Sequence, residues 1–198
     1  MVLAVCYHGT TFAVAKQIEA GRLAFQPSVH DWNWLGTGIY FFQDAPKRAA
    51  LWARFRYPRQ ETAVLEAEID LEGCLDLFEA RAWAQLRMAY TEFLASEDQL
   101  ESGATQEGLR IEQGIACTNA FPADEARRWE ISRNFRDRAF LDWYVRRMQI
   151  RKPVRSIRSP FLWGEALYAD SFLFDWAHAQ VSVVDASGII GAARIVAP

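Results

Sequence analysis

Apolar and polar positions change in blocks along the chain, and each block predicts one short element of secondary structure. The apolar run at 2–7 predicts a buried strand. Apolar residues three or four positions apart over 11–20 predict an amphipathic helix that Thr10 or Thr11 caps. The first twenty residues therefore predict a strand that leads directly into a helix.

The next blocks continue this alternation of strand and helix. The run IYFF at 39–42 predicts a short strand. Asp44 is the expected cap of the helix that follows, with Pro46 in its first turn and Arg56 near its end. Residues 62–71 alternate apolar and acidic side chains, which predicts a strand with one buried and one solvated face.

The second half of the chain changes from strand patterns to helical spacing and back. A short strand is expected at 74–78, and helical spacing follows at 79–95 and at about 122–149. We interpret 79–150 as a helical insertion. The run AHAQVSVVD at 177–185 predicts a late strand, and the fold class expected from these elements is α+β.

Composition supports a single folded domain over 1–198. The chain has 198 residues, of which 51% are hydrophobic and 24% charged. No stretch reaches the ~18 consecutive apolar residues of a membrane span, and the start resembles no secretory signal, so we expect a cytoplasmic protein without membrane contact. The three cysteines, Cys6, Cys74 and Cys117, show no metal-ligand spacing and are expected to be free, mostly buried thiols, and we expect no metal.

Charge is distributed unevenly along the chain. The net charge is −3, yet the stretch from Arg127 to Arg158 holds eleven basic and three acidic residues. One interpretation is a surface that attracts an anion, and the alternative is a solvated helix face whose charges are paired. The overall charge argues against a coat protein that binds nucleic acid without sequence preference.

Two short motifs carry candidate chemistry. The first is Tyr7-His8-Gly9-Thr10, where the first strand gives way to the helix. Glycine lets the backbone approach a ligand closely, and histidine can form a hydrogen bond to a hydroxyl through either ring nitrogen. The alternative is an ordinary turn at the end of a strand.

The second motif is the run GTGIYFF at 36–42, which is followed by Trp52 on the next expected helix. Tyr40 and Trp52 could flank a flat cationic ring such as oxidised nicotinamide, because aromatic faces attract such rings. The alternative is that both side chains pack into the core.

Taken together, the two motifs resemble the ADP-ribosyltransferase superfamily, in particular its diphtheria-toxin-like and poly(ADP-ribose)-polymerase-like branch. The resemblance extends over three blocks: YHGTTFAVAKQIEAGRLAF, WLGTGIYFFQDAPKRAALW and AVLEAEIDLEGCLDL. It implies a split β core of two small sheets around an NAD cleft, here with a helical insertion. It also implies NAD as the substrate that supplies ADP-ribose, with no metal.

The resemblance assigns roles to individual positions in the first two blocks. His8 would bind the 2′-hydroxyl of the adenosine ribose, and the backbone of Gly9, with Thr10 beside it, would hold the nicotinamide amide. Tyr40 and Trp52 would sandwich the nicotinamide ring. Trp52 stands where the family usually has tyrosine, and Ala49 stands where a nicotinamide-binding serine is common.

The third catalytic position departs from the family pattern. The segment that is similar to the late strand of the family places Gln180 where a catalytic glutamate is usual. An amide accepts a hydrogen bond from a ribose hydroxyl but has no charge and cannot act as a base. Glu165 is the alternative carboxylate, since it lies just upstream, although it could equally be a solvent-facing loop residue. His178 lies where related transferases often carry a group that orients the acceptor, although it could also be an ordinary strand residue.

The function expected from this resemblance is mono-ADP-ribosylation of a protein or nucleic-acid acceptor, in the role of a toxin or a phage-conflict effector. Arg127 and Arg128, with the basic stretch they begin, are the candidates for binding the acceptor. The alternatives are an NAD glycohydrolase, a transferase acting on RNA phosphate groups and a catalytically inactive module that binds NAD or ADP-ribose. A further alternative is structural: the late helices form a surface that binds a partner, for example a neutralising protein.

Overall fold

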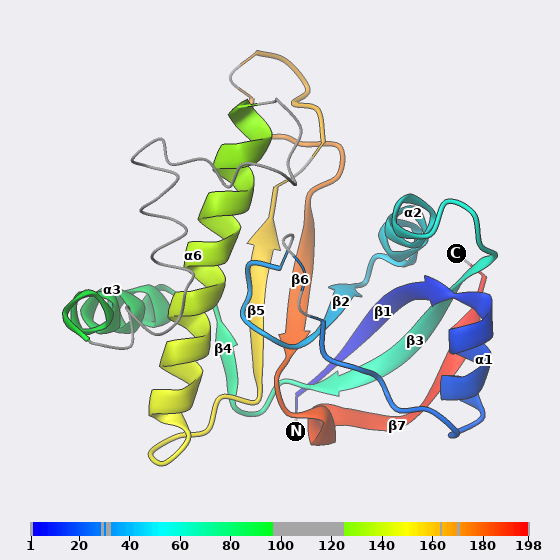
Figure 1. Cartoon of the computed structure of the whole chain (residues 1–198), viewed down its shortest axis with the longest axis horizontal. Helices are drawn as coiled ribbons and strands as arrows, with labels where there is room; N and C mark the ends of the chain where they lie inside the picture. The colour runs from blue at the N-terminus through cyan, green and yellow to red at the C-terminus, as the bar shows by residue number, and fades with distance from the viewer. Residues whose placement is uncertain are drawn as a thin grey trace. The chain divides into compact units, whose positions relative to one another are not determined.

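The strands join into one mixed sheet of seven strands in the computed structural model of this chain (Figure 1). The strands are β1 (Leu3–Thr11), β2 (Ile39–Gln43), β3 (Thr62–Asp70), β4 (Cys74–Asp76), β5 (Ser156–Phe161), β6 (His178–Val183) and β7 (Ile189–Val196). Their order in the sheet is β4-β5-β6-β2-β1-β3-β7, and β4 pairs with β5 in parallel whereas the other pairs are antiparallel. The helices in the described part of the chain are α1 (Phe12–Glu19), α2 (Pro46–Arg56), α3 (Ala80–Ala95), α6 (Glu125–Met148) and the 3₁₀ turn η1 (Ala186–Gly188). The α+β class expected from the sequence is confirmed.

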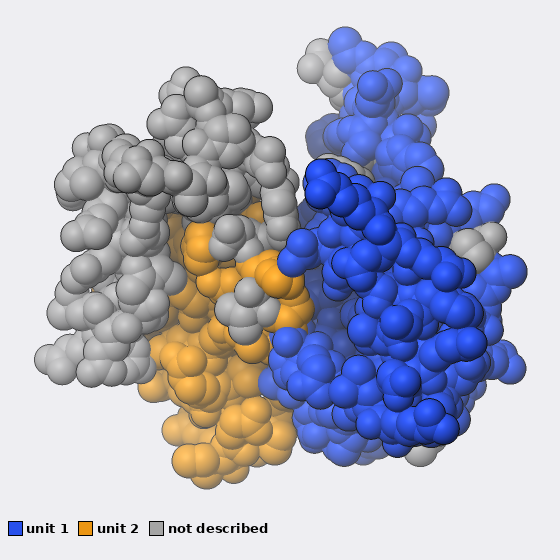
Figure 2. Space-filling view, turned by 45° about the vertical axis from the view of Figure 1, so that its right-hand side comes forward, with its two compact units in different colours: residues 1–27, 38–78, 155–198 blue, residues 28–37, 79–154 orange. Residues whose placement is uncertain are grey.

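The structure describes residues 2–28, 30, 33–96, 125–162, 164–169 and 171–197, and for 125–132 it describes the backbone alone. Within this range the chain divides into two compact units (Figure 2). Unit 1 consists of 1–27, 38–78 and 155–198, and it contains the whole sheet with α1 and α2. Unit 2 consists of 28–37 and 79–154, so the expected helical insertion falls within it.

The shortest ladder of paired residues in the sheet lies between β1 and β2. β1 pairs with β3 along its full length, but it pairs with β2 only at Cys6 and Tyr7. The expected core of two small sheets therefore takes the form of one hydrogen-bonded sheet, because these two residue pairs connect its halves. Figure 1 shows β1, β3 and β7 diverging from β2, β6 and β5 on the two sides of this junction.

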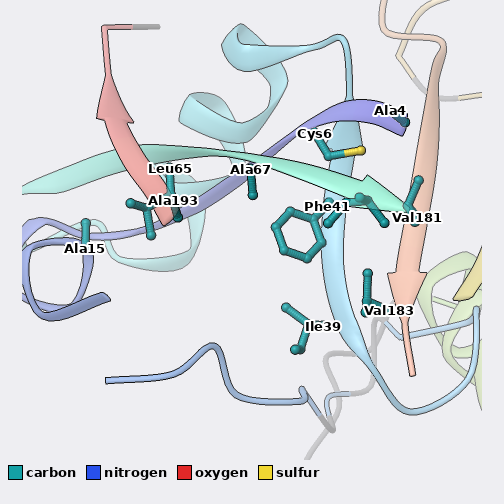
Figure 3. Close-up of a cluster of buried hydrophobic side chains, with 11 residues drawn as sticks. Ala4, Cys6, Ala15, Ile39, Phe41, Leu65, Ala67, Val181, Val183 and Ala193 are labelled. Carbon is teal, nitrogen blue, oxygen red and sulfur yellow. The ribbon is translucent and has the colours of Figure 1, made fainter. Parts of the chain in front are cut away.

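One face of the sheet carries the main hydrophobic core of unit 1. Its buried side chains come from both halves of the sheet and from α1, and they surround the ring of Phe41 (Figure 3). The fully buried members include Cys6, Phe41, Leu65 and Val181. Apolar packing therefore connects the two halves of the sheet across the short β1–β2 ladder.

A second core cluster lies on the opposite face. Val64 follows the alternation of β3 and faces away from Leu65, and it packs with Phe42, Ala49 and Ala50. The helices α1 and α2 therefore cover opposite faces of β3. On β2, Ile39 and Phe41 belong to the main core, and Phe42 belongs to the second cluster.

The ends of the first two helices agree with the sequence except at one residue. Thr11 caps α1 by accepting a hydrogen bond from the Val14 amide at 3.3 Å, and Gly21 follows with a φ of +66°. Pro46 begins α2 as expected. The predicted Asp44 cap is wrong, because Asp44 takes a φ of +52° and the N-cap position falls on Ala45.

Unit 2 is held together by aromatic packing between its two helices. The Phe93 ring of α3 lies 5.5 Å from the rings of both Phe140 and Trp143 of α6. The loop residues of the same unit are fixed to α6 by Asp142, which accepts hydrogen bonds from the Thr37 amide at 2.6 Å and the Thr37 hydroxyl at 2.8 Å. These contacts give the predicted helical insertion a core of its own.

The two described cysteines are free thiols, as the sequence predicts. Cys6 is buried and Cys74 is half-buried, both are free, and burial raises their pKa values to about 12 and about 11. Cys117 lies outside the described residues. No helix in the described part of the chain is long and apolar enough to cross a membrane.

Candidate functional site

His8 lies one residue beyond the point where β1 stops pairing with β2. Its Nδ1 atom is 2.9 Å from the backbone oxygen of Tyr40, 32 residues away in the sequence. A carbonyl oxygen only accepts hydrogen bonds, so Nδ1 carries the proton, and Nε2 is the acceptor in the neutral ring. The structure thus brings the His8 ring to the backbone of Tyr40. The ring contacts Phe41 on the main-core face, whereas the Tyr40 side chain lies on the other face of β2.

Aromatic rings surround the His8 imidazole. Its centroid lies 5.4 Å from that of Phe25 and 5.6 Å from that of Phe41. Desolvation by burial lowers the pKa of His8, and the hydrogen bond to Tyr40 opposes this shift in part. The ring is therefore neutral at pH 7, which keeps Nε2 available as an acceptor.

Gly9 is fixed by its contact with α2. A Cβ atom at this position would stand 2.1 Å from the backbone oxygen of Ala49 and 2.9 Å from its carbonyl carbon. Only glycine allows β1 and α2 to approach this closely. The glycine of the first motif thus has a packing role, in addition to the nicotinamide-binding role that the resemblance implies.

We expect Gly9→Ala to lower the free energy of unfolding by about 3 kcal/mol, because a backbone oxygen cannot move aside as a side chain would. Urea denaturation measures this loss. Gly21→Ala is the matched control, since Gly21 has a positive φ of +66° and nothing within 4 Å of its Cβ position. Backbone strain alone costs about 1 kcal/mol there. Equal losses in the two variants would contradict the contact with α2.

Tyr40 and Trp52 lie on separate elements of unit 1. Tyr40 is half-buried on β2, where it pairs with Ser182 of β6. Trp52 is half-buried on α2 and packs against the second core cluster, with its ring 6.0 Å from that of Phe55. The nicotinamide sandwich between Tyr40 and Trp52 stays a prediction.

The β6 strand presents a polar strip on the face that carries Tyr40. His178, Gln180 and Ser182 alternate with residues of the main core, and Phe42 pairs with Gln180 as Tyr40 does with Ser182. Ser182 is fully buried, and its hydroxyl has no hydrogen-bond partner among the described atoms. Gln180, the residue at the expected third catalytic position, thus lies on the strand next to β2 and on the same face of the sheet as Tyr40.

His178 is oriented by its own backbone surroundings. Its Nδ1 atom lies 2.8 Å from the backbone oxygen of Trp176, and its ring centroid lies 5.1 Å from that of Phe42 and 5.4 Å from that of Phe161. Burial lowers the pKa of His178, and the nearby Arg48 cation lowers it further, although the hydrogen bond to Trp176 raises it.

Glu165, the alternative carboxylate, lies on the segment between β5 and β6. Its side chain is exposed, and its amide donates a hydrogen bond to the Asp175 carboxylate at 2.9 Å. Gln180 is half-buried beside Phe42. Of the two candidates, the structure places Gln180 on the strand face that Tyr40 shares.

Sequence reasoning missed Arg48 and Trp176. Arg48 is 8% exposed, and its guanidinium carbon lies 5.2 Å from the Trp176 ring and 5.9 Å from the Phe42 ring. Burial lowers the pKa of Arg48, and Asp175 opposes that shift. Helical spacing was the signal that could have identified Arg48, because it lies four residues before Trp52 and therefore on the same side of α2.

The basic stretch is only partly described. Arg127 and Arg128 belong to α6, but their side chains lie outside the described part of the structure. Further along, Arg147 forms an ion pair with Glu92 at 2.6 Å, and Arg158 forms one with Asp76 at 2.8 Å. Arg147 on α6 fits the interpretation of a solvated helix face with paired charges, whereas Arg158 lies on β5 with its side chain 23% exposed.

Neither the protein-family models, nor the curated proteins, nor the solved structures gave a match to this chain. Among the described residues, no group of three or more histidine, cysteine, aspartate or glutamate side chains could hold a metal ion. The evidence that bears on function lies in the two motifs and in the geometry of unit 1.

Proposed function

We propose that this protein is a mono-ADP-ribosyltransferase that uses NAD to modify a macromolecular acceptor. The observation that supports this most is the hydrogen bond of 2.9 Å between His8 and the backbone of Tyr40. It joins two motif positions that lie 32 residues apart and that the resemblance assigns to the same substrate.

Each residue has a definite part in this proposal. His8 accepts a hydrogen bond from a ribose hydroxyl through Nε2, because Nδ1 is occupied by Tyr40. Tyr40 offers an aromatic face to the nicotinamide ring. Gln180 accepts a hydrogen bond from a hydroxyl of the second ribose.

Buried polar atoms on the same strand face fit a ligand rich in hydroxyl groups. Among the described residues, His178 Nε2 and Ser182 Oγ are buried and have no hydrogen-bond partner. Buried polar atoms nearly always have partners in folded proteins, so such atoms call for a ligand or an ordered water. They flank Gln180 on β6, at the position where the resemblance expects the second ribose of NAD.

The neutral side chain of Gln180 limits the reaction. It provides no negative charge to stabilise the positive charge that grows on the ribose as nicotinamide leaves. This favours transfer of single ADP-ribose units over chain elongation. It also favours a second candidate function, a module that binds NAD without turnover.

The test is incubation of the purified full chain with NAD carrying ³²P in its adenylate part, with and without cell lysate. We expect nicotinamide release together with label on a macromolecule, and protease or nuclease digestion then identifies the acceptor class. Release without macromolecular label would point to a glycohydrolase. NAD binding without any release would replace the proposal with the binding module.

A further inference from the structure

The reaction proposed above lacks a base at its third catalytic position. An acceptor that carries a proton on its nucleophilic atom has to lose that proton as the new glycosidic bond forms. The Gln180 amide cannot take the proton at neutral pH. A nearby side chain must therefore supply the base if the acceptor is a hydroxyl group.

His178 has the geometry of such a base. It lies two residues before Gln180 on β6, so the two side chains share one face of the sheet about 7 Å apart along the strand. Its Nδ1 atom donates to the Trp176 carbonyl at 2.8 Å. In the neutral ring this leaves the lone pair on Nε2, which is the atom that can accept a proton.

The Nε2 atom of His178 has no hydrogen-bond partner among the described residues and is buried. Phe42 of β2 and Phe161 of β5 contact the imidazole ring. Because the atom is buried, the side chains that cover it have to move when the acceptor enters. Trp176, which is 37% exposed, adjoins the strand at this point.

The charges around His178 select the kind of acceptor. Arg48 from α2 is the cation that acts on His178, and Asp175, from the segment before β6, acts on Arg48 in turn. A guanidinium or ammonium acceptor would be repelled by Arg48, and a carboxylate acceptor would need no base. A neutral hydroxyl both tolerates the arginine and requires a base.

We propose that His178 is the general base of the transfer reaction and that it takes the proton of a hydroxyl acceptor through Nε2. The inference rests on the proposed function. As the acceptor oxygen forms a bond to C1′ of the ribose, the O–H proton passes to Nε2 and the C1′–N bond breaks. The bonding pair leaves with nicotinamide, which departs neutral, and the imidazolium then returns its proton to solvent.

The first test compares wild-type protein with His178→Ala and His178→Gln. We expect both variants to bind NAD within about twofold of wild type in calorimetry and to release nicotinamide ~10²-fold more slowly. Added imidazole should restore part of the rate to His178→Ala, because the vacated space admits it. His178→Gln is the matched control, since its side chain fills that space and should prevent rescue.

The pH profile is a second readout. In wild type, turnover should fall on the acid side with a pKa below 6.5, because burial and Arg48 favour the neutral ring. Protonation of Nε2 below that pKa removes the base. His178→Gln should show a changed acid limb, because only the protonation of His8, whose pKa burial also lowers, then reduces turnover.

The outcomes separate the inference from the function on which it rests. If wild-type protein releases no nicotinamide, the proposed function fails. If wild type is active and His178→Ala keeps its rate, or imidazole gives no rescue, the assignment of the base is overturned. Label on protein, on nucleic acid or on free ADP-ribose then identifies the source of the hydroxyl as a side chain, a ribose or water.

The state of the ring is tested without any turnover. Nitrogen NMR of the protein labelled in its three histidines should show His178 with the proton on Nδ1 at pH 7, and the signal is assigned by its loss in His178→Gln. A proton on Nε2, or a charged ring at this pH, would overturn the inference.

Discussion

Replacing His8 with alanine should abolish NAD turnover, with a loss of at least ~10²-fold in nicotinamide release. The variant loses both the Nε2 acceptor and the hydrogen bond to the Tyr40 backbone, which measures 2.9 Å in the structure. Tyr40→Ala should lose turnover to a similar extent, because it removes the aromatic face. The rate of nicotinamide release, measured by chromatography, tests both variants.

Conservative variants separate the two roles of His8. In His8→Asn the side-chain amide can still donate to the Tyr40 carbonyl, but no atom remains at the position of Nε2. We expect this variant to unfold near the wild-type urea midpoint and still to lack turnover. His30→Ala is the matched control, because His30 is exposed and belongs to unit 2. Normal turnover in His8→Asn would remove His8 from the substrate site.

Replacing Gln180 with glutamate should raise nicotinamide release by about 10- to 100-fold. The two side chains have nearly the same shape, so the half-buried position on β6 tolerates the change. The new carboxylate would stabilise the positive charge that grows on the ribose as the glycosidic bond breaks. Initial rates at pH 7 with saturating NAD measure this gain.

Glu165 provides the decisive comparison for Gln180. Glu165→Ala should leave the rate unchanged, because the Glu165 side chain is exposed on the segment before β6. Gln180→Ala should lower the rate, since it removes the hydrogen-bond acceptor. A wild-type rate in Gln180→Glu together with an inactive Glu165→Ala would transfer the third catalytic role to Glu165.

The sequence predicted the elements whose burial follows a simple period. The alternation of β3 is visible in the letters TAVLEAEID, and Leu65, Ala67 and Ile69 lie in the main core as predicted. The other face is solvated only in part, because Val64 on that face is buried against α2. The helix after Thr11 begins and ends at residues with strong local preferences, so both of its boundaries were predictable. Local chemistry determined where these elements lie, whereas the cover of Val64 by α2 depends on tertiary packing.

The strand β5 was missed because its buried side chains are polar. Ser156 and Ser159 are 1% and 3% exposed, although serine in a run such as SIRSPF is typical of a surface loop. Parallel pairing with β4 and antiparallel pairing with β6 hold this segment in the sheet. Such long-range pairing leaves no period in the sequence.

The candidate site was predictable to the extent that it depends on motifs. His8 and Tyr40 were identified from their residue types, but the hydrogen bond between them required the fold. Arg48 was missed because a basic residue in the first turn of a helix is ordinarily exposed, as the neighbouring Lys47 is. The spacing from Trp52 indicates which side of α2 carries Arg48, and the packing of Arg48 against Phe42 in the fold shows that it is buried.

The alternation of β2 between two environments limits how this protein can change in evolution. Ile39 and Phe41 belong to the main core, while Tyr40 and Phe42 face the side that carries Gln180. Loss or gain of a single residue within this strand would exchange these faces and bury Tyr40 in the core. Point substitutions can therefore accumulate on either face, whereas single-residue insertions and deletions should be confined to the loops that flank β2.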